Sequence, residues 1–216
     1  MISILIPIFN GIEFIDSSVS SVINQSYTDW ELIIGVNGHE KNSDVYAEAK
    51  KIEQISDKIK VIDLFYIKGK SNALNKMLDY CSGGYIALLD VDDIWHPNKL
   101  AVQSQYLNIF HVIGTKCVYF GDLENIVPNI PVGDISNHDF KLGNPIINSS
   151  SIIRKELCHW EENGIEDYDL WLKLRMQGKK FYNCDNILVR HRIHRDSAFN
   201  SKGHHNKVDE LIKKYT

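Results

Sequence analysis

The chain has 216 residues, of which 44% are hydrophobic, and a formal net charge of -4 at neutral pH. This length and hydrophobic content suit one sizeable core with an appended smaller part, and the negative charge disfavours a general nucleic-acid-binding protein. The four cysteines lie far apart with no CxxC pair, which disfavours a zinc site or a disulfide framework and favours free thiols in a reducing compartment.

The sequence contains no pattern for membrane insertion or secretion. No apolar run approaches the roughly 20 residues that a membrane-spanning helix needs. The opening residues 1–7 lack the basic leader and the cleavage site of a signal peptide. We therefore expect a cytoplasmic protein with no transmembrane segment and no nucleic-acid partner, and we leave open a peripheral contact with the inner face of the membrane.

The first hundred residues alternate between apolar strands and amphipathic helices. The predicted strands are short apolar runs bounded by turn residues: Ile2–Ile6 (ended by Pro7), Trp30–Val36, Ile59–Phe65 and Tyr85–Leu89. The predicted helices have apolar residues at spacings of three and four, or lie between two strands: from Gly11 onward, Ser43–Ile55 and Ser71–Leu78. This alternation predicts right-handed βαβ units and a parallel α/β sheet.

Three carboxylates, Asp90, Asp92 and Asp93, follow the fourth predicted strand. A buried strand cannot hold them in its body, because desolvating an unpaired carboxylate is costly, so they must lie past its carboxyl end. That edge of an open α/β sheet is where ligands bind. Clustered acids repel one another, which favours a divalent cation with oxygen ligands, Mn²⁺ or Mg²⁺; the simpler alternative is a solvated acidic turn before a helix.

Three more polar loops are expected at the same edge. Pro7–Gly11, Asn37-Gly38 and Gly69–Ser71 follow the first three predicted strands. If each loop lies at the carboxyl end of its strand, they converge with the acidic segment on a crevice where a nucleotide would lie.

Two other motifs offer alternatives. Gly69-Lys70-Ser71 resembles the end of a phosphate-binding P-loop, but the first glycine of that motif is replaced by Leu64, which disfavours an NTPase. Leu89–Ile94 resembles the aspartyl-nucleophile motif of haloacid-dehalogenase-like phosphatases, in which Asp90 would be the nucleophile. In that family the motif normally follows the first strand, so we keep a phosphatase only as a minor alternative.

The second half carries fewer regular patterns. A helix after Pro97 precedes a strand over Val112–Phe120, and residues 121–141 are expected to form an irregular, mobile surface segment. Residues 143–153 predict a turn into a strand. Its polar start suits binding of a sugar hydroxyl, or equally a serine-rich turn into an edge strand.

Residues 166–174 open a helix that ends near Gly178. Acids in its first turn, Glu166 and Asp169, are expected as ordinary partners of the helix dipole. Asp167 shares a helix face with Trp171 and Leu174, the face that must pack inward, so its carboxylate needs a partner or a chemical function.

Taken together, the motifs over residues 2–197 resemble glycosyltransferase family 2 in order and spacing. They are Ile4–Asn10, Asp29–Ile34, Lys70–Asn75, Leu89–Pro97, the Glu166-Asp167 pair before Leu170-Trp171, and Val189–Ser197. The resemblance implies an α/β GT-A fold, with a Rossmann-like, mostly parallel central sheet flanked by helices and a smaller acceptor-side portion. It implies one domain over 1–199, with a nucleotide-sugar-binding half (1–97), an acceptor-side half (98–199) and a tail over 200–216.

The resemblance also implies roles for individual residues. Asp167 would be the catalytic base. The residues implied on the nucleotide and donor side are Pro7, Asn10, Asn37, Lys70, Asp90 and Asp92, and those on the acceptor side are Asn144, Glu166 and Trp171. The implied ligands of Mn²⁺ or Mg²⁺ are Asp92, Asp93 and His194, with His191 competing for the last place, while Arg192 would offset phosphate charge.

The implied reaction is inverting transfer of a sugar from a nucleotide-diphosphate donor to a hydroxyl of a glycan or lipid-linked acceptor, in cell-surface polysaccharide or glycan biosynthesis. A UDP-sugar is the favoured donor, although Val36-Asn37-Gly38-His39 stands where many relatives carry Asp-Asp-Gly-Ser. Asn37 still offers a donor and an acceptor to a base edge. The alternative outside enzymology is a catalytically silent subunit that binds sugar nucleotides.

Overall fold

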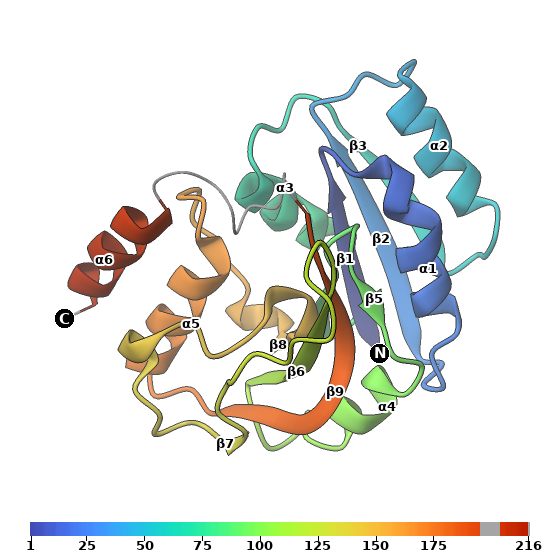
Figure 1. Cartoon of the computed structure of the whole chain (residues 1–216). Coiled ribbons are helices and arrows are strands. Elements are labelled where there is room, and N and C mark those ends of the chain that lie inside the picture. The colour runs from blue at the N-terminus through green and yellow to red at the C-terminus, as the bar shows by residue number, and fades with distance from the viewer. Residues whose placement is uncertain (195–203, 216) are drawn as a thin grey trace.

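The computed structural model describes residues 1–194 and 204–215. Its first half is a parallel sheet in the order β3-β2-β1-β4, with helices in the connections (Figure 1). The strands are β1 (Ile2–Ile8), β2 (Trp30–Asn37), β3 (Ile59–Leu64) and β4 (Tyr85–Leu88). The helices are α1 (Ile15–Ile23), α2 (Asp44–Glu53) and α3 (Lys70–Met77), and the 3₁₀ turns are η1 (Ile12–Phe14) and η2 (Leu78–Tyr80). The predicted βαβ units are therefore confirmed within a residue or a few at each boundary.

The second half extends the same sheet in the order β4-β8-β6-β9-β5, and β7 pairs with β9. Its strands are β5 (Ile94–Trp95), β6 (Val112–Gly121), β7 (Gly133–Asp134), β8 (Ile152–Arg154) and β9 (Phe181–Ile193). Its helices are α4 (Lys99–Ser104), α5 (Glu166–Met176) and α6 (His204–Lys214), with 3₁₀ turns η3 (Phe140–Leu142), η4 (Asn148–Ser150) and η5 (Lys155–Leu157). Because β8 runs antiparallel to both β4 and β6, the sheet as a whole is mixed.

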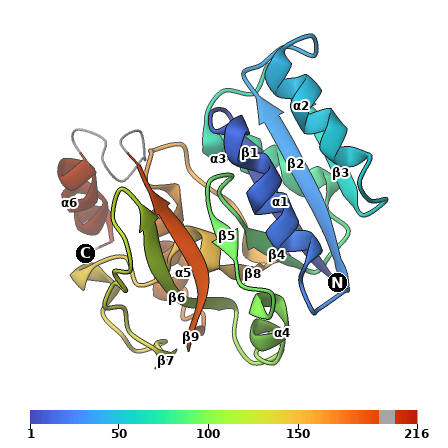
Figure 2. The same cartoon turned by 45° about the vertical axis from the view of Figure 1, so that its right-hand side comes forward.

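Helices cover both faces of the sheet, as β1 requires, because its side chains alternate between the two faces and nearly all of them are buried. Ile4 and Ile6 face one core with α1, α2 and α4, whereas Leu5 faces the other with α3 and α5. Figures 1 and 2 both place α6 beside α5, at the opposite end of the molecule from α2. In residues 1–194 and 204–215, every helix is too short or too polar to cross a lipid bilayer.

The first strand does not end at Pro7, as we expected, but continues to Ile8. Pro7 pairs with Gly35 of β2, whereas the pairing of β1 with β4 ends at Leu5. The carbonyl of Leu5 accepts a hydrogen bond from the Leu89 N–H, so the backbone of Leu5 faces β4. The backbone of Pro7, two residues later, faces the same side, where the pairing with β4 has already ended. Its missing N–H therefore leaves no ladder bond unmade.

Three expectations for the second half also change. The resemblance implied that the Val189–Ser197 segment follows the last core strand, but residues 189–193 lie inside β9, because parallel pairing with β6 continues to Ile193. The strand after residues 143–151 is not an edge strand, since β8 lies between β4 and β6. Residues 121–141 are largely irregular but include β7 and buried Phe140, which packs edge-on against Phe181 with ring centroids 4.8 Å apart.

Candidate active site

Asp90 lies just past β4 and is bound by three side chains from other parts of the chain. Lys70 Nζ donates to Asp90 Oδ1 at 2.8 Å, and Asn148 Nδ2 donates to both carboxylate oxygens at 3.1 and 3.0 Å. The Ser149 hydroxyl donates to Asp90 Oδ2 at 3.2 Å. Burial raises the pKa of Asp90, but the charge of Lys70 and the hydrogen bond from Asn148 outweigh burial and lower it to about 2.

Lys70 begins α3 and connects the two acidic segments. Its Nζ lies 2.8 Å from Asp90 Oδ1 and 3.4 Å from Glu166 Oε1 at the start of α5. Burial lowers the pKa of Lys70, but the charges of Asp90 and Glu166 outweigh burial and raise it. The ammonium group therefore joins the carboxyl end of β4 to the N-terminus of α5.

Asp167 is half-buried in the first turn of α5. Asn144 Nδ2 donates to Asp167 Oδ2 at 3.0 Å. Burial and the charge of Glu166 raise the pKa of Asp167 to about 6, against the opposing effects of Lys70 and Asn144. Such a carboxylate is mostly ionised at neutral pH and still has a strong affinity for a proton, as a general base requires.

Asp92 faces a histidine that directly follows β9. His194 Nε2 lies 2.9 Å from Asp92 Oδ2. Burial and the charges of Asp93 and Asp90 raise the pKa of Asp92, whereas the contact with His194 lowers it. The structure thus brings together two of the three side chains that we expected as metal ligands.

Asp93 is fully buried, and both of its carboxylate oxygens are bound within the protein. His191 Nδ1 lies 2.9 Å from Asp93 Oδ2, and the Arg192 backbone N–H donates to Asp93 Oδ1 at 2.7 Å. Burial lowers the pKa of His191, but the hydrogen bond and charge of Asp93 raise it to about 9. Asp93 therefore ties the turn after β4 to β9, and this geometry disfavours it, and His191 with it, as metal ligands.

Arg192 is held beside Asp92 by one hydrogen bond and two rings. Its Nε donates to the carbonyl of Asp92 at 3.0 Å. Its guanidinium carbon lies 4.3 Å from the ring centroids of both Phe14 and Phe120. Stacking on two aromatic faces fixes the guanidinium plane, which is the group suited to binding phosphate oxygens.

Asp92 and His194, which contact each other directly at 2.9 Å, are both residue types that bind divalent cations. Across residues 1–194 and 204–215, no group of three or more His, Cys, Asp or Glu side chains is arranged to hold a metal ion. Because Mg²⁺ often binds through one or two protein groups and substrate phosphates, a two-residue site is compatible with a cation that enters with a nucleotide.

The loop after β1 approaches the acidic segment. Gly11 has φ +86°, and a Cβ there would lie 2.9 Å from Val91 Cγ1, so only a glycine allows this close contact. Asn10 is exposed in this loop, whereas Pro7 is half-buried inside β1. The predicted convergence of this loop with residues 90–93 is thus observed for Gly11.

The loop after β2 packs on the loop after β1. Asn37 is the last residue of β2 and only 4% exposed. Gly38 has φ +77°, and a Cβ there would meet the Phe9 ring at 2.7 Å. His39 Nε2 lies 2.5 Å from the carbonyl oxygen of Phe9. The two loops therefore form one surface at the carboxyl ends of β1 and β2.

Two residues of α5 differ from expectation. Trp171 is fully buried in the core, which disfavours the predicted contact with an acceptor. Asp169 is 1% exposed and binds Asn163 Nδ2 at 2.7 Å, the Tyr215 hydroxyl at 2.5 Å and Lys214 Nζ at 3.1 Å.

Asn148 and Ser149 are the functional candidates that sequence reasoning missed. We expected their segment to be a polar turn able to bind a sugar, without predicting that it holds Asp90. No local signal reveals the contact, because Asn148 and Asp90 are 58 residues apart.

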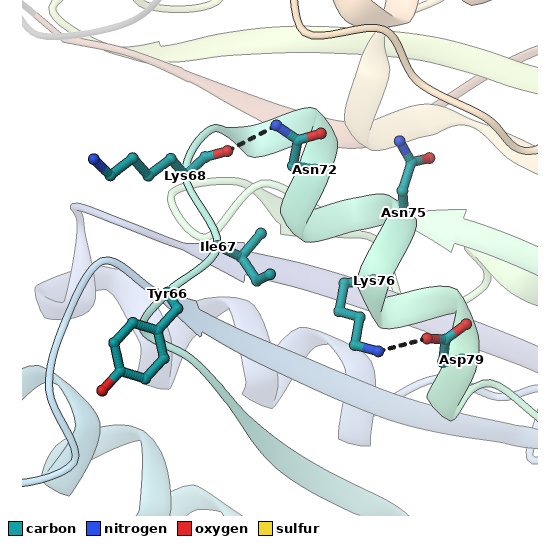
Figure 3. A pocket seen from close by; sticks show the side chains of 7 residues that line it. All are labelled: Tyr66, Ile67, Lys68, Asn72, Asn75, Lys76 and Asp79. Atoms are coloured by element: carbon teal, nitrogen blue, oxygen red, sulfur yellow. Dashed lines mark hydrogen bonds and ion pairs between the residues drawn. The ribbon is translucent and has the colours of Figure 1, made fainter.

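A cavity of about 620 Å³ lies beside α3 (Figure 3). Its lining consists of Tyr66, Ile67, Lys68, Asn72, Asn75, Lys76 and Asp79. None of these is a predicted site residue, although Asn72 and Asn75 belong to the same helix as Lys70. Lys76 and Asp79 form an ion pair at 2.8 Å, and Asn72 Nδ2 donates to the Lys68 carbonyl at 2.9 Å. A second cavity, of about 310 Å³, lies between α5, residues 137–141 and Tyr215.

The sequence of this chain is similar to a known enzyme family. The sequence model described as Glycosyl transferase family 2 matches residues 3–160. The chain is 30% identical, over 94% of its length and 81% of the relative's, to the Escherichia coli protein named UDP-Glc:alpha-D-GlcNAc-diphosphoundecaprenol beta-1,3-glucosyltransferase WfgD.

Solved structures share the fold at low sequence identity. S. aureus TarS 1-349 in complex with UDP-GlcNAc superposes with a TM-score of 0.78 and 14% identity, over 99% of this chain and 65% of that one. The mannosyltransferase PcManGT from Pyrobaculum calidifontis, in complex with GDP-Man and Mn²⁺, gives 0.71 and 13%, over 99% and 62%. The chain therefore spans somewhat less than two-thirds of each solved chain, and the predicted GT-A fold is confirmed.

Proposed function

The chain belongs to glycosyl transferase family 2, and from that premise we propose that it transfers a sugar from a nucleotide-diphosphate donor to an acceptor hydroxyl with inversion at the anomeric carbon. The observation that carries the proposal is the position of Lys70, which contacts Asp90 on one side and Glu166, next to Asp167, on the other. This contact holds the two acidic segments together around one site.

In the proposed reaction, the oxygen of the acceptor hydroxyl attacks the anomeric carbon while Asp167 takes the proton of that hydroxyl. The new carbon–oxygen bond forms as the bond from the sugar to the diphosphate breaks, and the diphosphate leaves with the electron pair. The pKa of Asp167, about 6, keeps it ionised before the step. A single displacement of this kind inverts the configuration of the sugar.

The departing diphosphate gains negative charge. In this proposal, positively charged side chains of β9 lie beside it. Arg192, held between Phe14 and Phe120, and protonated His191 would offset this charge. Asp92 and His194 would hold Mn²⁺ or Mg²⁺ together with the donor, and such an ion, when bound, stabilises the leaving group. Asp90, ionised and fixed by Lys70, Asn148 and Ser149, would accept hydrogen bonds from the ribose or the donor sugar.

We propose a UDP-sugar as the donor and a lipid-linked glycan as the acceptor. The named activity of the E. coli relative supports both classes, and GDP-Man in one solved structure makes a GDP-sugar the alternative to test. In this assignment residues 1–97 bind most of the donor, with His191, Arg192 and His194 added at its diphosphate, and the rest of residues 98–199 bind the acceptor. A lipid-linked acceptor in polysaccharide biosynthesis would bring the protein to the inner face of the membrane.

A binding screen followed by a transfer assay tests the proposal. We expect UDP or GDP with Mn²⁺ to raise the melting temperature; a ligand at 100 times its Kd adds about 2.7 kcal/mol to the free energy of unfolding. Sugar transfer to a diphosphate-linked lipid glycan is then followed by mass spectrometry, and NMR of the product gives the anomeric configuration. EDTA should remove both effects, and Asp92→Asn should remove the Mn²⁺ dependence of nucleotide binding.

The possible results separate the alternatives. No melting shift with any nucleotide would overturn the proposal. Binding without transfer to any acceptor would indicate the silent binding subunit. Release of phosphate from simple esters, lost in Asp90→Asn, would indicate a phosphatase.

A further inference from the structure

Behind the proposed site, α3 is joined to the segment that precedes α5 by a set of hydrogen bonds that we name the α3 clamp. Its α3 residues are Ser71, Asn72 and Asn75, and its partners are Trp160, Glu161 and Glu162. Resting on the proposed function, we infer that Glu162 is a positioning residue, which acts through the first turn of α3 to keep Lys70 between the two acidic segments.

Glu162 supplies the central contact of the α3 clamp. Its Oε2 accepts from the backbone N–H of Ser71 at 3.1 Å and from that of Asn72 at 3.5 Å. These two N–H groups lie in the first turn of α3 and have no partner inside the helix. A carboxylate at this place also interacts favourably with the positive end of the helix dipole.

The backbone at Gly69 is shaped for this carboxylate. Gly69 has φ +87°, and a Cβ at this position would overlap the Glu162 carboxyl group. A side chain at this position would therefore strain the backbone and also displace the Glu162 carboxyl group. Both observations point to close contact between the start of α3 and Glu162.

Three further hydrogen bonds hold the same segment. The buried Ser71 hydroxyl donates to the Glu161 carbonyl at 2.9 Å. Asn75 bonds twice to Trp160, donating to its carbonyl at 2.8 Å and accepting from its N–H at 3.0 Å. Figure 3 shows the side chain of Asn75 projecting from α3 at the wall of the larger cavity. Segment 160–162 is thus fixed along two turns of α3.

The α3 clamp lies next to the site residues Lys70 and Glu166 along the chain. Lys70 precedes Ser71 in α3, and Glu166 follows Glu162 by four residues at the start of α5. Lys70 in turn contacts Glu166 at 3.4 Å and Asp90 at 2.8 Å. Loosening the clamp therefore releases the backbone that carries Lys70 and the segment that leads into Asp167.

This arrangement predicts the sign of an electrostatic change at Asp167. The charged and polar groups that face Asp167 are Glu166 on α5, Lys70 on α3 and Asn144, and Lys70 acts to lower its pKa. If Lys70 moves away, the pKa of Asp167 rises above about 6. Removing only the negative charge of Glu162 has the opposite sign, because one repulsive charge is lost.

Three variants of the full chain separate these effects. Glu162→Ala removes the clamp and the charge, Glu162→Gln removes the charge but keeps an oxygen that accepts from Ser71, and Glu161→Gln removes an equal charge from the adjacent position. Glu161 contacts His159 at the surface, at 3.4 Å, so its side chain is outside the clamp. The measurements are the ¹³C NMR titration of the Asp167 carboxyl, amide exchange of Ser71 and Asn72, and the pH profile of kcat/KM.

We expect Glu162→Ala to speed amide exchange at Ser71 and Asn72, to raise the titration midpoint of Asp167 and to move the acid limb of the pH profile to higher pH. Transfer should fall about 10-fold to 100-fold, as for displaced catalytic groups. Glu162→Gln should restore most of the transfer, and Glu161→Gln should match the wild type.

An unchanged or lower Asp167 midpoint in Glu162→Ala would overturn the inference, even if transfer falls. The titration does not depend on catalysis. If the wild type transfers no sugar but the Asp167 midpoint still rises in Glu162→Ala, the proposed function fails and the positioning contact stands.

Discussion

Residues 90–93 and residues 166–169 each place three carboxylates within four positions, but one segment follows a buried strand and the other opens a helix. Despite this difference, each segment has one carboxylate buried in the protein, one in contact with Lys70 and one with a raised pKa. Proximity in sequence therefore does not give neighbouring acids a common role; the partners that the fold supplies do.

The buried members, Asp93 and Asp169, are 0% and 1% exposed. Asp93 is bound by His191 and the backbone of Arg192 from β9, and Asp169 by Lys214 and Tyr215 at the end of α6. Both carboxylates thus attach their segment to an element that comes later in the chain. Their contribution is to position the segment, because a carboxylate enclosed by protein donors has no oxygen left for a ligand.

The two carboxylates with a raised pKa, Asp92 and Asp167, have different neighbours. Asp92 lies 2.9 Å from a histidine nitrogen, whereas Asp167 accepts a hydrogen bond from the neutral amide of Asn144. Burial and a neighbouring carboxylate raise the pKa of both groups. In the proposed mechanism Asp92 and His194 hold a cation together, and the neutral donor beside Asp167 leaves this carboxylate able to exchange a proton.

The largest effect is expected for catalysis at Asp167. Asp167→Asn should lower kcat about 10²-fold to 10⁴-fold, the range for loss of a general base, with the fold unchanged. Wild-type activity should fall as pH decreases through about 6, the pKa of Asp167, because the protonated group cannot accept the acceptor's proton. Initial rates across the pH range check both; a variant within threefold of the wild type would show that Asp167 is not the base.

A smaller effect, on stability rather than chemistry, is expected two residues away. Asp169→Ala leaves Asn163, Lys214 and Tyr215 without their acceptor and should lower the free energy of unfolding by about 2–3 kcal/mol. For a chain of this size the melting temperature should fall by about 4–12 °C. Calorimetry checks this against Asp209→Ala, an exposed carboxylate on α6 that should cost under about 0.5 kcal/mol. Equal melting temperatures for the two variants would contradict a structural role for Asp169.

The smallest effect has the opposite sign. The pKa of Asp167 is about 6 in the folded protein and about 3.9 in an unfolded chain. Ionisation therefore favours the unfolded chain as pH rises from about 4 to 6, and the resulting loss of stability persists at pH 7. Asp167→Asn should then be about 1 kcal/mol more stable than the wild type at pH 7, since the group is half-buried, and no more stable below pH 4. Urea unfolding at pH 7 and below pH 4 measures the stability of both proteins. If Asp167→Asn is only as stable as the wild type at pH 7, ionised Asp167 does not destabilise the fold.

The first half of the fold could be predicted almost completely. The strands β1 to β4 follow from apolar runs such as Trp30–Val36, and α3 from its apolar spacing, because each βα unit is built from residues close in sequence. The position of Asp90 past the end of β4 followed from the cost of burying a carboxylate. In the second half the same approach missed that β8 inserts between β4 and β6, because pairing partners there are far apart in sequence.

The sequence by itself determined the family, the parallel half of the sheet and which carboxylates could carry chemistry, since these depend on local hydrophobic patterns and on motif order. Only the tertiary structure decided which partner each carboxylate has. Asp93 and His191 are 98 residues apart, and Asp169 and Tyr215 are 46 apart. The pKa and the role of a carboxylate depend on burial and on charges within a few ångströms, and those neighbours exist only once the chain has folded.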